Sequence, residues 1–215
     1  MVLAVTNLSG FGGGNNFVAV TNTYTSGTAQ TETVPNGASQ VVIDLWGPGG
    51  GGGGSDDVGS DGGGGGGYCR KTISLVGGGT FTWTVGAIGT GGPRFDPGTA
   101  GGQTKVDNGT YGTTVTLRAN GGDPGLRNGT SPGAGGTASG GDTNTSGTTG
   151  ANGGAHSGGD GGAGANGGAG GAGGIDGGAN AQPGVAPGGG GGGGKDSNSF
   201  AGGDGASGKI IFAWT

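Results

Sequence analysis

Two single residues are the first candidates for chemistry in this sequence of 215 residues. Cys69 is the only cysteine and His156 the only histidine, so a nucleophile and base of the cysteine-hydrolase kind would have to be this pair. Cys69 opens a strand-like segment, where a small core residue is the ordinary role, and His156 has no cysteine or acidic cluster at metal-ligand spacing. We therefore expect no enzymatic activity, no catalytic residue, no cofactor and no metal site.

Two glycine stretches end in lysine, as a phosphate-binding loop does. Residues 203–209 have the G-x4-G-K spacing, but Ile210 replaces the required Ser or Thr, and the stretch precedes a strand instead of a helix. Residues 189–195 fail in the same way, because Asp196 follows the lysine. A glycine-rich background explains both matches.

The acidic stretch 57–62 partly matches a calcium-binding loop. Its third ligand position is Gly59 and its closing Glu position is Tyr68, so a polar turn between two glycine runs is the simpler interpretation. The sequence leaves open whether a cation binds near the aspartates of this turn, Asp56, Asp57 and Asp61.

Glycine dominates the composition, with 70 of 215 residues. That share is near the one-third of collagen, but only 8 prolines are present, which argues against a triple helix. Hydrophobic residues make up 28% of the chain, too few for a conventional core that serves all of it. The formal net charge of −5 gives no electrostatic support for nucleic-acid binding, and we expect no nucleic-acid partner.

Three unbroken glycine runs, 49–54, 62–67 and 188–194, organise the rest of the chain. They are either flexible linkers or polyglycine II helices, which are extended rods with three residues per turn and no internal hydrogen bonds. Downstream, in 158–175, glycine recurs with a period of three beside one column of Asp, Ala, Asn and Ile. A linker needs no period, so ordered rods are favoured. As one rod, 158–175 would span roughly 55 Å at about 3.1 Å per residue.

The side chains predict where each rod lies in a bundle. A rod surrounded on all sides has no room for side chains, so 49–54, 62–67 and 188–194 are expected to be the least exposed. A peripheral rod can carry one outward column, which places 158–175 at the edge. The first two runs are joined by a short polar turn and are expected to lie antiparallel. Each hydrogen bond between rods contributes only about 0.5–1.5 kcal/mol, so the bundle needs many rods and anchoring strands.

Alternating apolar residues predict strands around the glycine runs. The clearest is 40–46, with Val41, Ile43 and Leu45 on one face. Further strands are expected at 17–21, 68–76, 80–85, 113–118 and 209–215. The predicted fold is mainly β: short antiparallel, sandwich-like strands flank a bundle of polyglycine II helices, with essentially no α-helix.

One pair of neighbouring strands is expected to form a hairpin. The segments 68–76 and 80–85 are separated only by Gly77–Gly79, and the second alternates apolar residues with threonine. The stretch 91–108, which contains Pro93 and Pro97, is expected to be a loop.

Two loops carry the mixture of apolar and charged residues that recognition sites use. These are 93–97 and 123–128, and loops on a rigid scaffold are common places for binding residues. Alternatively, their apolar side chains only fasten the loops to the body of the protein. The candidate receptor-binding residues are Arg94, Phe95, Asp96, Asp123, Leu126, Arg127 and Asn128.

Several strand-to-glycine junctions resemble the glycine-rich domain of bacteriophage and prophage tail proteins. The matching stretches are 45–48 before the first run, 68–73 after the second, 81–86 and the closing 208–215. The resemblance covers 33–215 and leaves out 1–32, which we expect to be an attachment or oligomerisation segment. The rods also resemble those of the fibre-tip adhesins of T-even-like phages, which bind host receptors through loops at the end of the bundle.

The resemblance implies a virion protein, most simply a tail-fibre or tail-tip component that attaches to the bacterial surface. Its implied partners are other tail proteins, contacted through 1–32, and a surface glycan or outer-membrane protein. A homotrimer is expected, because phage fibres are commonly trimeric. The start of the chain, Met1–Val5, lacks the basic residues of a secretion signal, so synthesis in the host cytoplasm is expected.

Two alternatives stay open. One is a purely structural virion protein, such as a decoration or connector subunit, in which the rods only provide compact packing. The other is an ice-binding protein similar to polyglycine II antifreezes, with the Ala and Asn column of 163–172 as its flat face.

Overall fold

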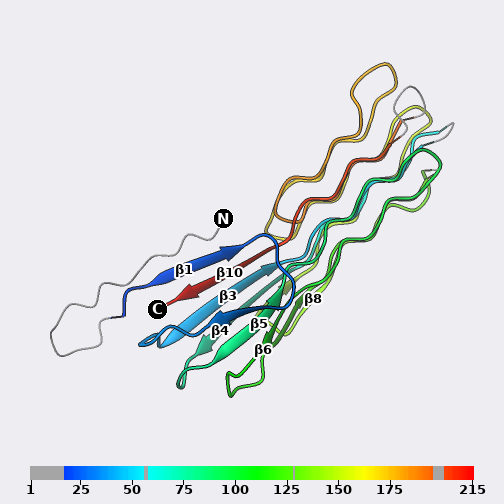
Figure 1. Cartoon of the computed structure of the whole chain (residues 1–215). Helices are drawn as coiled ribbons and strands as arrows, with labels where there is room; N and C mark the ends of the chain where they lie inside the picture. The colour runs from blue at the N-terminus through cyan, green and yellow to red at the C-terminus, as the bar shows by residue number, and fades with distance from the viewer. Residues whose placement is uncertain (1–16, 56–57, 128, 196–200) are drawn as a thin grey trace.

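The computed structural model describes residues 17–55, 58–127, 129–195 and 201–215. Figure 1 shows an elongated molecule in which strands gather at one end and irregular extended segments continue from them to the other end. The described residues form ten β-strands and no helix. The predicted mainly-β class is therefore confirmed.

The strands form two antiparallel sheets. The first sheet has the order β1 (Val20–Tyr24), β10 (Lys209–Trp214), β3 (Gln40–Trp46), β4 (Tyr68–Ser74) and β9 (Thr143–Thr145). The second sheet has the order β2 (Gln30–Thr33), β5 (Thr80–Thr84), β6 (Thr104–Asn108), β7 (Thr116–Ala119) and β8 (Ala138–Ser139). The C-terminal strand β10 thus lies between β1 and β3, where it closes the first sheet with partners on both sides.

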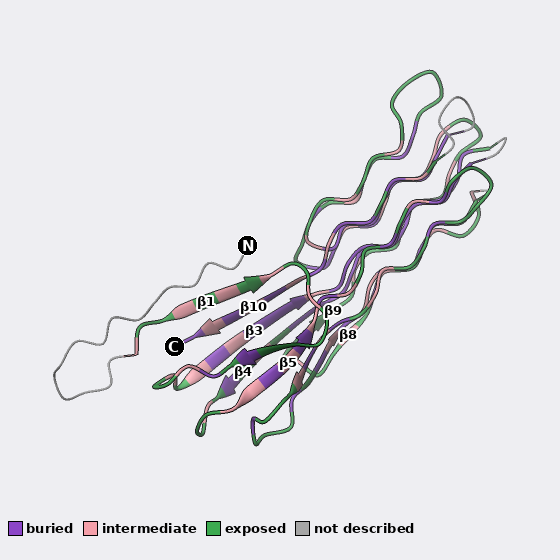
Figure 2. Cartoon of the chain, viewed as in Figure 1, coloured by how far each residue is buried: buried purple, intermediate pink, exposed green. Residues whose placement is uncertain are grey.

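The two sheets share one hydrophobic core between them. Val41, Ile43 and Leu45 of β3 are fully buried, as their alternation predicts. They pack in the same cluster as Phe81 of β5 and Phe212 of β10, whose ring centroids lie 6.1 Å apart. Figure 2 shows buried residues alternating with more exposed ones along the strands.

The predicted hairpin of 68–76 and 80–85 is wrong. β4 pairs with β3 in the first sheet, whereas β5 pairs with β2 and β6 in the second. The glycine connection is left-handed at Gly77 (φ 90°), and Gly79 has a φ of 143°. Both strands have an apolar face to bury, and packing those faces against each other across the core covers them better than a hairpin with one shared face.

Several short polar strands were not predicted. Residues 104–108, within the predicted loop 91–108, form β6, and the strand expected at 17–21 instead runs from Val20 to Tyr24. β1 and β2 pair with β10 and β5, so part of the expected attachment segment 1–32 lies within the two sheets. Residues 1–16 lie outside the described part of the chain.

Beyond the sheets, glycine-rich segments run outward and back beside one another. The runs 49–54 and 62–67 are antiparallel neighbours, as predicted: the N–H of Gly50 donates to the carbonyl of Gly64, and the N–H of Gly53 to that of Asp61, both at 2.9 Å. Hydrogen bonds between different segments replace those that a helix or a sheet would make.

The run 49–54 is hydrogen-bonded on all sides with a period of three. Its first and fourth N–H groups donate to 203–206, its second and fifth to 61–64, and its third and sixth to 96–99. Carbonyl groups of 48–53 accept from three further segments, 89–92, 122–125 and 191–194. The period is the one that polyglycine II predicts; the helix type itself stays a prediction.

Close packing explains why these runs contain only glycine. A Cβ added at any residue of 49–54 would lie closer than 3.0 Å to a backbone carbonyl oxygen of a neighbouring segment. The same is true of 62–67. All residues of 49–54, 62–67 and 188–194 are buried, whereas 158–175 alternates buried and exposed residues. The predicted inner and edge positions are confirmed.

The segment 158–175 is not one rod. The chain reverses at 164–168, where the N–H of Gly167 donates to the carbonyl of Gly164 at 3.1 Å and Asn166 has a φ of 46°. The two halves then lie antiparallel, with the N–H of Gly161 donating to the carbonyl of Gly171 at 2.8 Å. The turn keeps the glycine spacing, so the period of three cannot reveal it. The single flat face over 163–172 that the ice-binding alternative requires is divided between two segments.

Trp46 fastens this turn to the sheets. Its indole N–H donates to the carbonyl of Asn166 at 2.9 Å, and the Lys209 ammonium lies 5.1 Å from the centroid of its ring. Lys209 is the first residue of β10. The lysine of the G-x4-G-K spacing therefore lies in a strand, where its ammonium contacts an aromatic ring.

Candidate functional site

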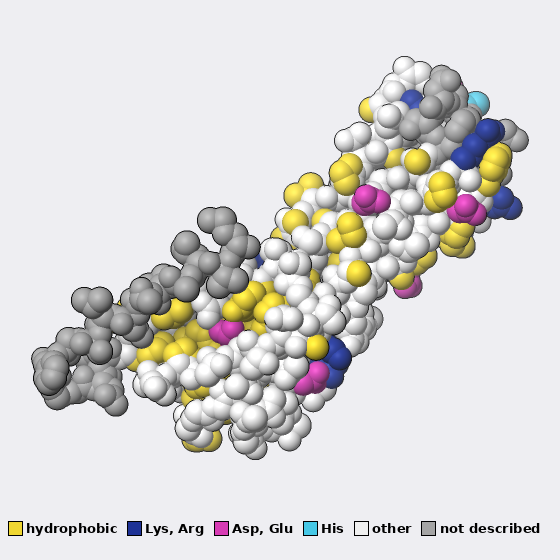
Figure 3. Space-filling model, in the orientation of Figure 1, with side chains coloured by type: hydrophobic (Ala, Val, Ile, Leu, Met, Phe, Trp, Pro, Cys, Tyr) yellow, Lys and Arg dark blue, Asp and Glu magenta, His cyan; other side chains and the backbone are white. Residues whose placement is uncertain are grey.

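The turns at the far end of the bundle form the main candidate site. The loop 93–97 and residues 126–127 lie there, close to Ser55 and to the end of the run 49–54. In Figure 1 this end lies opposite the C-terminus. In Figure 3, hydrophobic side chains and Lys or Arg side chains lie side by side on this end. We call 93–97 and 126–127 the far-end loops.

The structure brings the two far-end loops together. A guanidinium nitrogen of Arg127 donates to the carbonyl oxygen of Phe95 at 3.3 Å. The Arg94 guanidinium lies 4.4 Å from the centroid of the Phe95 ring, a cation–π distance. Phe95 has a φ of 71°, which is uncommon for a bulky residue and marks local backbone strain. The loop therefore holds its partly exposed aromatic ring on a strained backbone.

The apolar side chains of the far-end loops are exposed. Phe95 is 46% exposed and Leu126 is 40% exposed, and Val58 in the adjacent turn is also 40% exposed. Three exposed apolar side chains beside two arginines make a surface on which an aromatic contact and a charged contact can act together. The alternative that Phe95 and Leu126 only fasten the loops is not favoured by these exposures.

Other candidate residues lie elsewhere or outside the described part. Asp123 is exposed, but it lies on a glycine-rich segment nearer the sheets, where its main chain pairs with Gly64 and Ala134. Asp96 belongs to the far-end loops, and its carbonyl accepts from Gly54 at 2.9 Å. Asn128 is outside the described residues.

Asp61 holds the far end together from the inside. Its side chain is fully buried, and its carboxylate accepts the N–H of Ser131 at 2.8 Å and the N–H of Gly153 at 3.0 Å. In the sequence it was only a possible cation ligand beside Asp56 and Asp57, which lie outside the described residues. Within the described residues, no cluster of three His, Cys, Asp or Glu side chains is placed to hold a metal ion.

Replacing Asp61 with alanine is expected to lower the free energy of unfolding by about 2–4 kcal/mol, because two N–H groups lose their acceptor. Thermal or denaturant unfolding of the two proteins measures the loss. Asp123→Ala is the matched control, since this carboxylate is exposed. Equal stabilities of the Asp61 and Asp123 variants would contradict the anchoring role.

The Cys69–His156 pair does not exist. Cys69 lies in β4, where its thiol donates to the carbonyl of Ser139 at 3.4 Å, and burial raises the pKa of that thiol. His156 lies in a loop at the other end of the bundle, where its carbonyl accepts from Asp176. A buried thiol with a raised pKa is a poor nucleophile, so Cys69 acts as a small core residue.

A family model for a glycine-rich domain matches residues 21–215. The chain belongs to this family. The match begins within β1 and covers both sheets and all the described glycine-rich segments. No curated protein matches the sequence. None of the described residues belongs to a helix long and apolar enough to cross a membrane.

Proposed function

We propose that this glycine-rich domain is a bacteriophage virion protein, a tail-fibre or tail-tip component that attaches to the host cell surface. The observation that carries the proposal is that the shaft and the exposed candidate binding residues lie in different parts of the molecule. Buried glycine runs form the inside of a shaft, and the exposed Phe95 and Leu126 lie at its far end beside Arg94 and Arg127. The resemblance of the strand-to-glycine junctions to tail proteins supports placing the protein in a virion.

The far-end loops suit a bacterial surface receptor, either a glycan or an outer-membrane protein. An exposed aromatic ring with a guanidinium over it can stack on a sugar ring or pack against an apolar loop, and the second arginine can pair with a phosphate or carboxylate. A single small site of this kind binds weakly. A homotrimer would present three copies, and the gain would come from avidity and not from new contacts. In the proposal, residues 1–32 contribute the attachment to other tail proteins.

Virions assembled with Phe95→Ala, Arg127→Ala or both test the proposal. The double variant is expected to reduce the rate of adsorption to host cells at least tenfold, with particle yield unchanged. Val76→Ala is the matched control, because Val76 is 80% exposed but lies in the connection between the sheets, beyond β4. Unchanged adsorption by intact double-variant particles would exclude receptor binding by these loops.

Two other outcomes decide between the alternatives. Failure of particles to assemble without the protein, together with normal adsorption of the loop variants, would favour a purely structural subunit. Thermal hysteresis of the purified protein would favour ice binding.

A further inference from the structure

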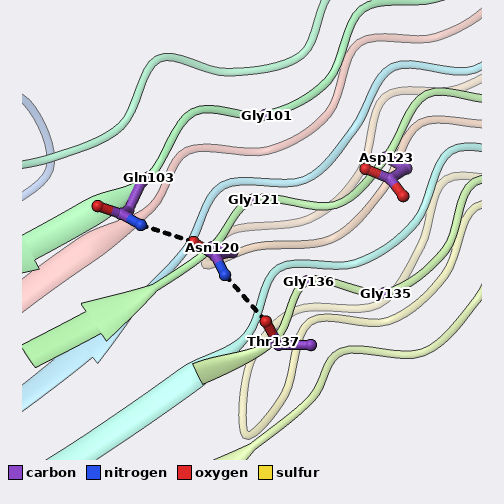
Figure 4. A pocket seen from close by; sticks show the side chains of 8 residues that line it. All are labelled: Gly101, Gln103, Asn120, Gly121, Asp123, Gly135, Gly136 and Thr137. Carbon is purple, nitrogen blue, oxygen red and sulfur yellow. Dashed lines mark hydrogen bonds between the residues drawn. The ribbon is translucent and has the colours of Figure 1, made fainter. Parts of the chain in front are cut away.

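A groove opens on the side of the bundle where it meets the second sheet. It has a volume of about 360 Å³, within the range of small-ligand sites. Figure 4 shows side chains from the ends of neighbouring strands around it, with Asp123 farther along the bundle. The lining residues are Gly101, Gln103, Asn120, Gly121, Asp123, Gly135, Gly136 and Thr137. This groove is separate from the far-end loops.

A relay of side chains fixes the polar wall of the groove. The Gln103 amide donates to Asn120 Oδ1 at 2.8 Å, and Asn120 Nδ2 donates to Thr137 Oγ1 at 2.9 Å (Figure 4). The relay sets the orientation of the Asn120 amide. It also leaves the Thr137 hydroxyl proton and Gln103 Oε1 to act as a donor and an acceptor toward a ligand.

The floor of the groove offers main-chain groups. Among the residues that the structure describes, the N–H groups of Gly121 and Gly135 donate to no oxygen of the protein. Most other N–H groups of these segments pair with a neighbouring segment, as those of Gly122 and Gly136 do. Both glycines line the groove, and neither has a side chain that could cover its N–H group.

The lining selects the chemistry of the ligand by elimination. Asp123 is the only charged lining residue, so an anion is disfavoured, and one carboxylate is too few for a divalent cation. No large apolar side chain lines the groove, which disfavours an apolar ligand. What remains is a neutral molecule rich in groups that both donate and accept hydrogen bonds.

We infer that this groove binds a saccharide. A sugar hydroxyl can donate to the Asp123 carboxylate or Gln103 Oε1 and accept from Thr137 or the N–H groups of Gly121 and Gly135. No aromatic residue lines the groove for stacking, so the sugar is recognised by hydrogen bonds to its hydroxyl groups. The groove is open and polar throughout, and binding at one copy is weak, gaining strength only when several copies act together.

Titration of the ¹⁵N-labelled full chain with the methyl glycosides of glucose, galactose, mannose and N-acetylglucosamine tests the inference. At least one glycoside is expected to shift the side-chain amide signals of Gln103 and Asn120 in a saturable way. Asp123→Asn is expected to weaken that binding about tenfold, because a charge-assisted hydrogen bond is lost. Asp176→Asn, an exposed aspartate that does not line the groove, is the matched control and is expected to bind as the unchanged protein does.

Three results would overturn the inference: no glycoside shifts these amides, the shifts gather at the far-end loops instead, or Asp123→Asn keeps full affinity. Phe95→Ala separates this site from the proposed attachment function, because it should reduce the rate of adsorption and leave glycoside binding in the groove intact.

Discussion

Gly52→Ala is expected to lower the free energy of unfolding by about 3 kcal/mol or more, through overpacking. The added methyl group would lie against the carbonyl of Gly192, closer than real Cβ atoms approach backbone. The backbone of a neighbouring segment cannot rotate away as a side chain does. Relief would separate the two segments and break the bonds that join them, from the N–H of Gly191 to the carbonyl of Gly50 and from the N–H of Gly194 to that of Gly53, both 2.9 Å. Denaturant unfolding gives the loss directly.

Gly78→Ala is the control for this effect. A Cβ at Gly78 would meet nothing within 4 Å, so this variant is expected to keep its stability within about 0.5 kcal/mol. Both changes add the same methyl group and remove the same glycine flexibility from the unfolded chain, and only the packing differs. Equal stabilities for Gly52→Ala and Gly78→Ala would show that the run 49–54 is not tightly enclosed.

Trp214→Ala is expected to lower the free energy of unfolding by about 3–5 kcal/mol. Its ring is fully buried in β10 between the two sheets, stacked on Phe212 at 5.8 Å, and its indole nitrogen lies 3.3 Å from the buried Glu32 carboxylate. The glycine bundle has almost no apolar core of its own, so it depends on these sheets. The bundle should therefore unfold in the same transition as the sheets, which circular dichroism and tryptophan fluorescence can compare.

Ile211→Ala is the matched control in the same strand. Its side chain points to the outer face of the sheet and is only half-buried, so a loss of about 1 kcal/mol is expected. If Trp214→Ala lowers the free energy of unfolding no more than Ile211→Ala does, the claim that β10 holds the core is contradicted. If the sheets and the bundle unfold in separate transitions, the claim that the bundle depends on the sheets is contradicted.

Strands with an apolar face were predictable, and strands with polar inward residues were not. The alternation in 40–46 predicts β3 with its buried face. β2 has Glu32 facing the core instead, and its carboxylate accepts hydrogen bonds from Asn22 and from the hydroxyl of Tyr24, both at 2.6 Å. A buried glutamate is favourable only when such partners surround it, and those partners come together only in the folded chain.

The glycine bundle was predictable in composition but not in path. Pure runs and a period of three indicate which segments are enclosed, since side chains cannot fit there. They do not indicate where a segment ends, because the turn at 164–168 keeps the same spacing. The anchoring role of Asp61 was also beyond prediction. Its carboxylate accepts hydrogen bonds from two backbone N–H groups in place of a carbonyl. These N–H groups belong to other segments, and only the folded chain brings them to Asp61.

For the candidate site, the sequence indicated both far-end loops but not their contact. Mixed apolar and charged residues between prolines pointed to 93–97. The bond from Arg127 to Phe95, and the placement of Asp123 in a separate groove, depend on the order in which segments pack. Nothing in the local sequence encodes that order.

The central claim is that the pure glycine runs are the enclosed core of the bundle, and amide hydrogen exchange tests it most directly. The amides of 49–54, 62–67 and 188–194 are predicted to exchange as slowly as those of β3, because each is buried and paired with a neighbouring segment. Exposed amides such as those of Gly78 and Gly112 should exchange rapidly. Rapid exchange across all three runs, with slow exchange in the sheets, would show that the glycine segments are flexible connections and would contradict the account.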